Sequence, residues 1–544
     1  MKKNTIRSAA LTISLCVLSS AFVSCGAASD APTDNGNYAP DNSYDYEDYA
    51  PAEAPAAAEE YCGGYEYPVQ PSPAEEYSSP VEGGFKDPKA EPLSTFSADV
   101  DTASYSNVRR LIEDGSFVPE DAVRAEEFIN YFDYDYPDPD EGKFSQYIEI
   151  GDCPWNASHK LMMVGLQGKR LENKEVPPSN LVFLIDSSGS MGSYDKLPLV
   201  QTAFSMLAEN LTENDRISIV TYAGSSSTLI EGADGSKKDD ILEALYSITA
   251  SGRTNGEGGI NTAYELAEEY FIEGGNNRVI LATDGDLNVG ASSAEELTEL
   301  IEEKRDSGIY LSVMGFGTGN YKDDRMEALA DNGNGNYSYI DSVDEAHRVL
   351  VEEMSGTLCT IAKDVKIQVE FNPSQVASYR LVGYDNRLMA AEDFYDETKD
   401  AGEVGAGHNV TALYEVELVS DGGTYHGIEL EFGDQHVQPL ENKTDTENER
   451  TELCKLSLTY KDTDTDEDIY TSQLFGMEKY SNAPSDRLKL AGAAAEFAML
   501  LKDSEYKGSS DYSYVTKTAN SLAGSSEKAA ELAELSKTAS SLFS

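Results

Sequence analysis

The central part of the sequence predicts an α/β domain built on a doubly wound parallel sheet. Between Leu161 and Leu350, short apolar runs alternate strictly with longer amphipathic segments. The apolar runs are continuous, which is typical of strands that helices cover on both faces. Because strands and helices alternate along the chain, we expect the strands to run parallel and the helices to connect them.

Each element of this domain can be placed from its pattern. The expected strands are 161–166, 181–185, 217–222, 278–282, 310–316 and 337–340. The expected helices lie near 196–210, 239–248, 259–271, 294–306, 324–330 and 343–354. The helical alternation stops after Cys359, so we place the α/β domain at residues 161–358.

The regions on either side of this domain have other patterns. Residues 93–160 combine two strand patterns with two short helical ones, which predicts a small α+β N-terminal extension. Residues 359–544 predict a C-terminal domain that is β-rich and then helical. Its expected strands are 365–371, 379–384, 411–419, 428–432 and 453–460, and its expected helices are 487–501, 512–522 and 527–542.

The N-terminus has the features of a signal peptide. A basic start is followed by an apolar stretch at 9–23, too short for an ordinary membrane span. Phe22-Val-Ser-Cys25 resembles a bacterial lipobox, and this resemblance implies cleavage after residue 24 with lipid attached to Cys25. Ordinary secretory cleavage near Ala27 is the alternative. We expect an extracytoplasmic protein of the cell envelope, anchored to a membrane by lipid and not spanning it.

Residues 25–92 predict a disordered, acidic tether that is rich in Pro and Tyr. The segment contains few aliphatic side chains, so it cannot bury enough apolar surface to offset the entropy of ordering. The whole chain has 98 Asp and Glu against 41 Lys and Arg, a net charge of −57. Because binding to phosphates needs a basic face, nucleic acid is excluded as a partner.

The cysteines do not form a recognisable metal motif. Cys62, Cys153, Cys359 and Cys454 are widely scattered, and no Cys-x-x-Cys pair is present. This spacing argues against a zinc site. Disulfides are possible outside the cytoplasm, and free buried thiols are the equal alternative.

Polar oxygen atoms follow two of the predicted strands. Asp186 ends the apolar run 181–185, and Ser188 and Ser190 follow it in a short loop. In open α/β sheets, ligands bind at the carboxyl ends of strands. Carboxylate and hydroxyl oxygens suit Mg²⁺. Thr254 in a Gly-containing loop and Asp284 at the end of another strand can converge on Asp186.

Together, Asp-x-Ser-x-Ser, a later Thr and Thr-Asp-Gly after a strand resemble the metal-ion-dependent adhesion site (MIDAS) of von Willebrand factor type A (VWA) domains. This resemblance implies a Rossmann-like fold that holds Mg²⁺, or else Mn²⁺ or Ca²⁺. It implies that hydroxyls of Ser188, Ser190 and Thr254 contact the metal, and that Asp186 and Asp284 act directly or through water. Asp286 and Asn288 either tune the site from outside the ligand set or only shape the turn.

The resemblance extends beyond the metal motif. Residues 94–140 and 362–394 resemble the N- and C-terminal extensions of a family of bacterial VWA lipoproteins. We therefore expect a binding protein whose metal takes a carboxylate from a protein ligand. The alternatives are an assembly or chaperone-like envelope subunit and, least favoured, a hydrolase. We expect no enzyme, because the sequence offers no nucleophile–base pair.

Overall fold

The computed structural model describes residues 75–77, 81–98, 101–171, 176–253, 256–285, 294–319, 321–353, 359–419 and 452–543. All of these residues lie within Glu66–Ser544, one of the two units into which the chain divides. Within these ranges, no helix has the length and apolar character needed to cross a bilayer. The predicted signal peptide, Cys25 and most of the predicted tether lie outside them.

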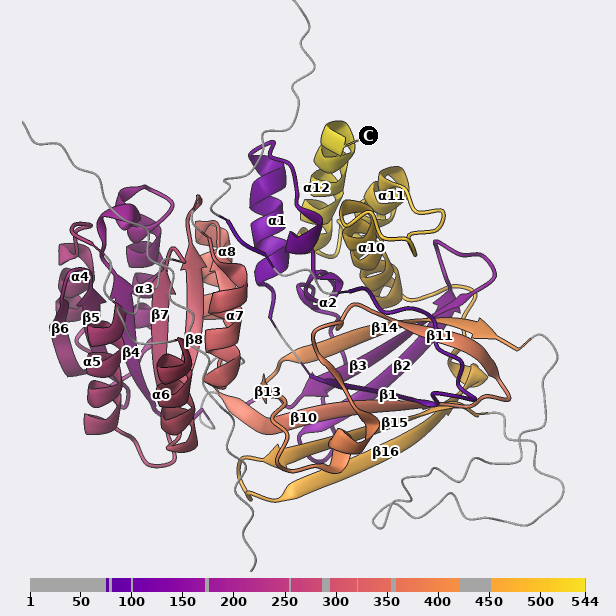
Figure 1. Ribbon diagram of the computed structural model, residues 1–544, viewed down its shortest axis with the longest axis horizontal. Helices are drawn as coiled ribbons and strands as arrows, with labels where there is room; N and C mark the ends of the chain where they lie inside the picture. The colour runs from indigo at the N-terminus through magenta and orange to yellow at the C-terminus, as the bar shows by residue number, and fades with distance from the viewer. Residues whose placement is uncertain are drawn as a thin grey trace, which may run out of the picture. The chain divides into compact units, whose positions relative to one another are not determined.

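The α/β domain contains a six-stranded sheet in the order β6-β5-β4-β7-β8-β9 (Figure 1). Its strands are β4 (Ser179–Asp186), β5 (Arg216–Tyr222), β6 (Ser226–Asp234), β7 (Asn276–Thr283), β8 (Ile309–Phe316) and β9 (Tyr337–Ile340). Its helices are α3 (Leu197–Asn210), α4 (Lys238–Ser247), α5 (Gly256–Glu269), α6 (Ala294–Asp306), α7 (Asp323–Asn332) and α8 (Val343–His347), which continues into a π-helical turn (Arg348–Glu352).

Helices cover both faces of this sheet, as predicted for a doubly wound fold. Alternate residues of β4 enter two separate cores: Phe183 packs with residues of α3, α4 and α8, whereas Leu184 packs with residues of α5, α6 and α7. Strands β5, β4, β7, β8 and β9 are parallel. The edge strand β6 is antiparallel to β5 and was not predicted, because its mixed polar sequence has no continuous apolar run.

One predicted strand of this domain belongs elsewhere. Residues 161–166 lie in β3 (Lys160–Gly168), which runs antiparallel between β2 (Phe144–Asp152) and β14 (Asn409–Leu418). The α/β domain therefore begins at β4, and the predicted start at residue 161 is wrong. A strand that is buried on both faces has the same apolar pattern in either kind of sheet, so its sequence alone did not reveal its partners.

The remaining strands form two antiparallel sheets around one core. One sheet has the order β12-β1-β10-β15-β16, with β13 also paired to β10, and the other has the order β11-β14-β3-β2. Ile367 from the first sheet and Val164 from the second share this core. The strands not yet placed are β1 (Leu93–Ser97), β10 (Thr360–Phe371), β11 (Val376–Val382), β12 (Leu388–Met389), β13 (Gly402–Gly405), β15 (Glu452–Asp462) and β16 (Asp468–Gly476).

The N-terminal extension is thus not a separate domain. Strand β1 pairs with β10 from Leu93 opposite Glu370 to Ser97 opposite Lys366. Strands on both sides of the α/β domain complete each other's sheets, so the predicted boundaries at 93–160 and 359–544 divide one sandwich. The predicted C-terminal strands are confirmed except 428–432, which lies outside the described residues, and β16 was missed.

Five helices pack together beside the sandwich (Figure 1). The three predicted C-terminal helices are confirmed. Of the two short helical patterns predicted within 93–160, the second forms a helix of six residues after a separate 3₁₀ turn at residues 120–122. The helices are α1 (Ala103–Glu113), α2 (Ala125–Asn130), α10 (Asp486–Leu501), α11 (Tyr512–Leu522) and α12 (Glu527–Phe543).

Two further expectations are settled by packing. The end of the predicted tether is ordered: Glu75 pairs with Arg110 at 3.2 Å, and the main chain of Lys86 bonds to that of Tyr379. The predicted limit of disorder at residue 92 is therefore wrong, because specific polar contacts replace the missing apolar ones. The cysteines at 153, 359 and 454 are buried free thiols, and burial raises the pKa of each.

Candidate functional site

The candidate site begins where two parallel strands end. All eight residues of β4 are buried, and the strand ends at Asp186. Ile185 lies opposite Ala282 of β7, so Asp186 and Asp284 follow neighbouring strand ends. Both side chains are almost completely buried, with exposed fractions of 0% and 1%. Two carboxylates held this deeply in an α/β edge need compensating positive charge or hydrogen bonds.

The loop after β4 connects the buried carboxylates to the surface. The backbone N–H of Ser188 donates to Oδ1 of Asp186 at 2.8 Å, which fixes the carboxylate. The hydroxyl oxygens of Ser188 and Ser190 lie 2.9 Å apart. Ser188 is buried and Ser190 is exposed, so two adjacent hydroxyls lead outward from the carboxylates.

A second loop is hydrogen-bonded to the first. The N–H of Ser251 donates to the carbonyl of Ser187 at 2.8 Å, and the N–H of Gly189 donates to that of Gly252 at 3.2 Å. Gly252 has φ +82°, a conformation that side chains disfavour. The loop that precedes α5 thus lies against the Asp-x-Ser-x-Ser loop, as the motif requires. Thr254 itself, like Asp286 and Asn288, lies outside the described residues.

Lys196 is a site residue that the sequence analysis missed. Its Nζ donates to Oδ2 of Asp284 at 2.8 Å, and its exposed fraction is only 7%. The alkyl stem lies over Gly317 at the end of β8, where a Cβ would come within 2.3 Å of Lys196 Cγ. The available signal was a lone lysine at the start of α3, six residues beyond Ser190.

Tyr222 forms the floor of the site at the end of β5. Its carbonyl accepts from both the N–H and the hydroxyl of Ser187. Burial raises the pKa of the phenol, and the neighbouring carboxylates of Asp186 and Asp284 add to this shift. The aspartates are therefore bordered by a neutral ring in a poorly solvated environment, where electrostatic interactions are strong.

This donor set fits a hard divalent cation. It combines carboxylate and hydroxyl oxygens, which are the ligands that Mg²⁺ and Ca²⁺ prefer. Among the described residues, no group of three or more His, Cys, Asp or Glu could hold a metal. A metal held at this edge would therefore take oxygens from the serine hydroxyls as well as from the two aspartates.

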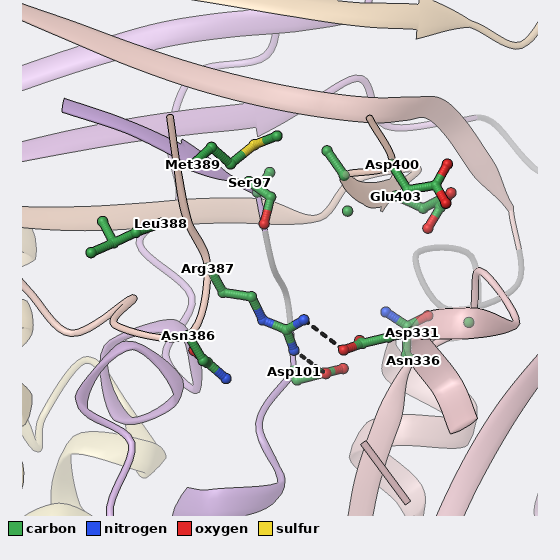
Figure 2. A pocket seen from close by; sticks show the side chains of 14 residues that line it. Ser97, Asp101, Asp331, Asn336, Asn386, Arg387, Leu388, Met389, Asp400 and Glu403 are labelled. Carbon is green, nitrogen blue, oxygen red and sulfur yellow. Dashed lines mark hydrogen bonds and ion pairs between the residues drawn. The ribbon is translucent and has the colours of Figure 1, made fainter. Parts of the chain in front are cut away.

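A second polar region lies between the α/β domain and the sandwich. It is a cavity of about 270 Å³ beside α7 and β12. Figure 2 shows Arg387 directed toward Asp331 and Asp101, with Asp400 and Glu403 together at another side of the cavity. Arg387 pairs with Asp331 at 2.7 Å and with Glu327 at 2.8 Å. These ion pairs attach the sandwich to α7 of the α/β domain.

Known proteins resemble this chain along most of its length. Family models match at 180–352 (von Willebrand factor type A domain), 356–542 (Uncharacterized protein YfbK, C-terminal) and 71–163 (von Willebrand factor). The chain is 40% identical over 443 residues to the uncharacterized protein YfbK of Escherichia coli (strain K12), a match that covers 80% of this chain and 75% of that protein. The first match begins where the structure begins the α/β domain, at β4.

Other relatives are less similar to this chain. Human inter-alpha-trypsin inhibitor heavy chain H3 is 32% identical over 195 residues, which is 34% of this chain and 22% of that protein. A solved structure of proximal thread matrix protein 1 from the mussel byssus has zinc in its MIDAS motif. It is 23% identical, covers 32% of this chain and 45% of that one, and has a TM-score of 0.27.

Proposed function

Because the chain belongs to the family of bacterial VWA-domain proteins that includes YfbK, we propose that it is a metal-dependent binding protein of the cell envelope. One observation carries the proposal: Asp186, Ser188 and Ser190 lie together at the end of β4, and Asp284 follows the neighbouring strand β7. The metal in this proposal is Mg²⁺, with Mn²⁺ and Ca²⁺ as substitutes. The ligand is a protein that supplies a carboxylate.

The chemistry of binding follows from burial. The buried carboxylates of Asp186 and Asp284 and the hydroxyls of Ser188 and Ser190 would hold a divalent cation, whose charge would offset that of the carboxylates. The exposed Ser190 marks the side from which a partner reaches the ion. A partner carboxylate placed there costs little in desolvation, since the cation offsets its charge. No nucleophile–base pair takes part, so the proposed activity is binding and not hydrolysis.

We also propose that this edge operates outside the cytoplasm, on a lipid anchor at Cys25. The proposal is supported by the lipobox-like Phe22-Val-Ser-Cys25 and by the acidic segment that follows. Lipid on Cys25 would hold the domain at a membrane surface. Growth with a radiolabelled fatty acid should label the full chain, and Cys25→Ser should remove the label.

The binding proposal is tested by capture of envelope proteins on the immobilised chain in Mg²⁺ and in EDTA. Asp186→Ala and Ser190→Ala should both abolish the capture that depends on Mg²⁺. Ser193→Ala is the matched control, because Ser193 is an exposed serine of the same loop outside the motif. Equal capture by wild type and Asp186→Ala in both buffers would refute the metal-bridged model. A folding enzyme or assembly factor among the captured proteins would instead indicate the assembly role.

A further inference from the structure

We propose that Lys196 is a built-in counter-ion that makes the metal and an acidic ligand bind as a pair. Lys196 weakens binding of the metal alone and strengthens binding of a carboxylate to the loaded site. The inference rests on the proposed function, since it concerns the same metal. It adds what the motif does not contain, namely a reason why the ligand must be anionic.

The lysine is held firmly in the site. Its Nζ lies 2.8 Å from Oδ2 of Asp284, and both side chains are buried. The stem lies against Gly317 so closely that a Cβ there would overlap it. Lys196 also directly precedes α3, and its carbonyl accepts from the N–H of Val200 in the first turn. Its backbone and its stem are therefore both fixed, which keeps the ammonium group beside Asp284.

The formal charges then decide what the loaded site accepts. Asp186 and Asp284 supply two negative charges, and Lys196 supplies one positive charge. Lys196 adds one positive charge beside Asp284, so a divalent cation bound there would leave the site one charge more positive than it would be without the lysine. A carboxylate is the ligand that this added charge attracts. An amine would be repelled, and a neutral hydroxyl or amide would leave the charge uncompensated.

The burial of Lys196 and Asp284 strengthens the effect of this added charge on metal binding. At a poorly solvated position, opposition between an ammonium and a divalent ion a few ångströms away changes metal affinity by about tenfold or more. The rest of the chain cannot substitute for this effect, because its net charge of −57 repels acidic partners at long range. Salt screens that distant repulsion but not a buried pair. Lys196 and the metal thus form a local cationic spot on an acidic protein.

Coupling between the two ligands follows by linkage. If the metal increases the affinity for a carboxylate, then the carboxylate increases the affinity for the metal by the same factor. The site is therefore expected to bind metal weakly alone and firmly when an acidic ligand is present. Removal of either the metal or the acidic ligand is therefore expected to release the other as well.

The test is a titration of the full chain with Mn²⁺. The electron paramagnetic resonance signal of free Mn²⁺ measures how much of the ion is bound at each step. Each titration is done alone, with acetate and with the neutral isostere acetamide. In wild type, acetate should tighten Mn²⁺ binding and acetamide should not. In Lys196→Met, Mn²⁺ alone should bind about tenfold more tightly, and the effect of acetate should shrink by a similar factor. Lys196→Arg should retain the wild-type pattern.

Two controls separate this role from a structural one. Lys304→Met removes a lysine that pairs with Glu268 at 2.6 Å on the surface of the same domain, and it should change neither affinity. Lys196→Gln repeats the test with a polar side chain if Lys196→Met fails to fold. The Mn²⁺-induced rise in melting temperature should be larger in Lys196→Met and Lys196→Gln than in wild type, because the metal then replaces the positive charge that these variants lack beside Asp284.

The possible failures are distinguishable. Unchanged Mn²⁺ affinity in both Lys196→Met and Lys196→Gln would overturn the counter-ion role and leave the metal-dependent function standing. An equal response to acetate and acetamide in wild type would overturn the selection for anions. Absence of Mn²⁺ binding in wild type would overturn the proposed function and this inference together.

Discussion

Two pairs of buried carboxylates in the α/β domain are compensated differently. The first pair is Asp186 and Asp284, with the ammonium group of Lys196 beside Asp284. We call the strand ends that carry these residues the metal edge, after the metal that we propose binds there. After β9, Asp341 and Glu345 lie with two guanidinium groups, those of Arg109 and Arg348. We call this second group the ionic cluster, and it consists of Arg109, Tyr131, Asp341, Glu345 and Arg348.

The ionic cluster is held by ion pairs, which extend to Glu531 at 3.1 Å from Arg109 and to Glu353 at 2.7 Å from Arg348. Arg109 of α1 pairs with Asp341 at 2.6 Å and with Glu345 at 2.9 Å. Nε of Arg348 donates to Glu345 at 3.0 Å, and the hydroxyl of Tyr131 donates to the same carboxylate at 3.0 Å. Burial alone would raise the pKa of Glu345, but the two arginines outweigh it and hold the pKa at about 2.

The difference in compensation distinguishes a structural cluster from a candidate binding site. In the ionic cluster each of the two buried carboxylates pairs with an arginine, so the cluster joins α8 to α1 through protein side chains. At the metal edge Lys196 pairs with Asp284, and Ser190 offers a hydroxyl at the surface. We therefore interpret the ionic cluster as structural and the metal edge as a binding site.

The largest effect is expected when the closed cluster is broken. Arg109→Met leaves Asp341 and Glu345 buried with one guanidinium fewer, which should lower the free energy of unfolding by about 3–5 kcal/mol. Urea denaturation followed by circular dichroism measures the loss. Arg305→Met is the control, because Arg305 pairs with the exposed Asp400 and should change stability by less than about 1 kcal/mol. Equal losses of unfolding free energy in the two variants would show that the ionic cluster stabilises the fold no more than a surface ion pair does.

A smaller effect is expected at a buried acid in α10. Among the described residues, no Lys or Arg forms an ion pair with its side chain. Glu496 of α10 accepts from Ser510 at 3.0 Å, and burial raises its pKa to about 8. Its protonated form is the one that the fold prefers. Stability should therefore fall as pH rises from about 4.5, the pKa expected in the unfolded chain, to about 8.

Glu496→Gln should remove that dependence, because the amide stays neutral. At pH 8 the variant should be more stable than wild type by about 1–3 kcal/mol, and at pH 4.5 the two should be nearly equal. Melting temperatures measured across this range provide the comparison. A wild-type advantage that grows toward pH 8 would contradict the raised pKa.

The smallest effect concerns coupling between the metal edge and the ionic cluster. The metal edge and the ionic cluster share one domain, and α8 leads through its π-helical turn toward β10 of the sandwich. Binding of metal with an acidic ligand should change amide hydrogen exchange at residues 343–353 by a few-fold. Exchange measured by mass spectrometry on wild type and Asp186→Ala tests this. Unchanged exchange at 343–353 in wild type would mean that the ionic cluster isolates the sandwich from the metal edge.

The candidate site could be predicted in part because its signal is local. Asp186, Ser188 and Ser190 lie within five residues at the end of an apolar run, and Asp284 ends another such run. Lys196 was missed because its role depends on Asp284, which is 88 residues away. The Arg109–Glu345 pair spans 236 residues and has no local signal at all.

The sequence by itself determined the alternation of strands and helices, the end of β4 at Asp186 and the presence of helices α10 to α12. These depend on the periodicity of neighbouring side chains. Only the tertiary structure decided that β3 belongs to the sandwich, that β1 pairs with β10 and that an ammonium group completes the metal edge. The physical reason is that strand partners and ion-pair partners are chosen across long stretches of chain, by which surfaces are buried together.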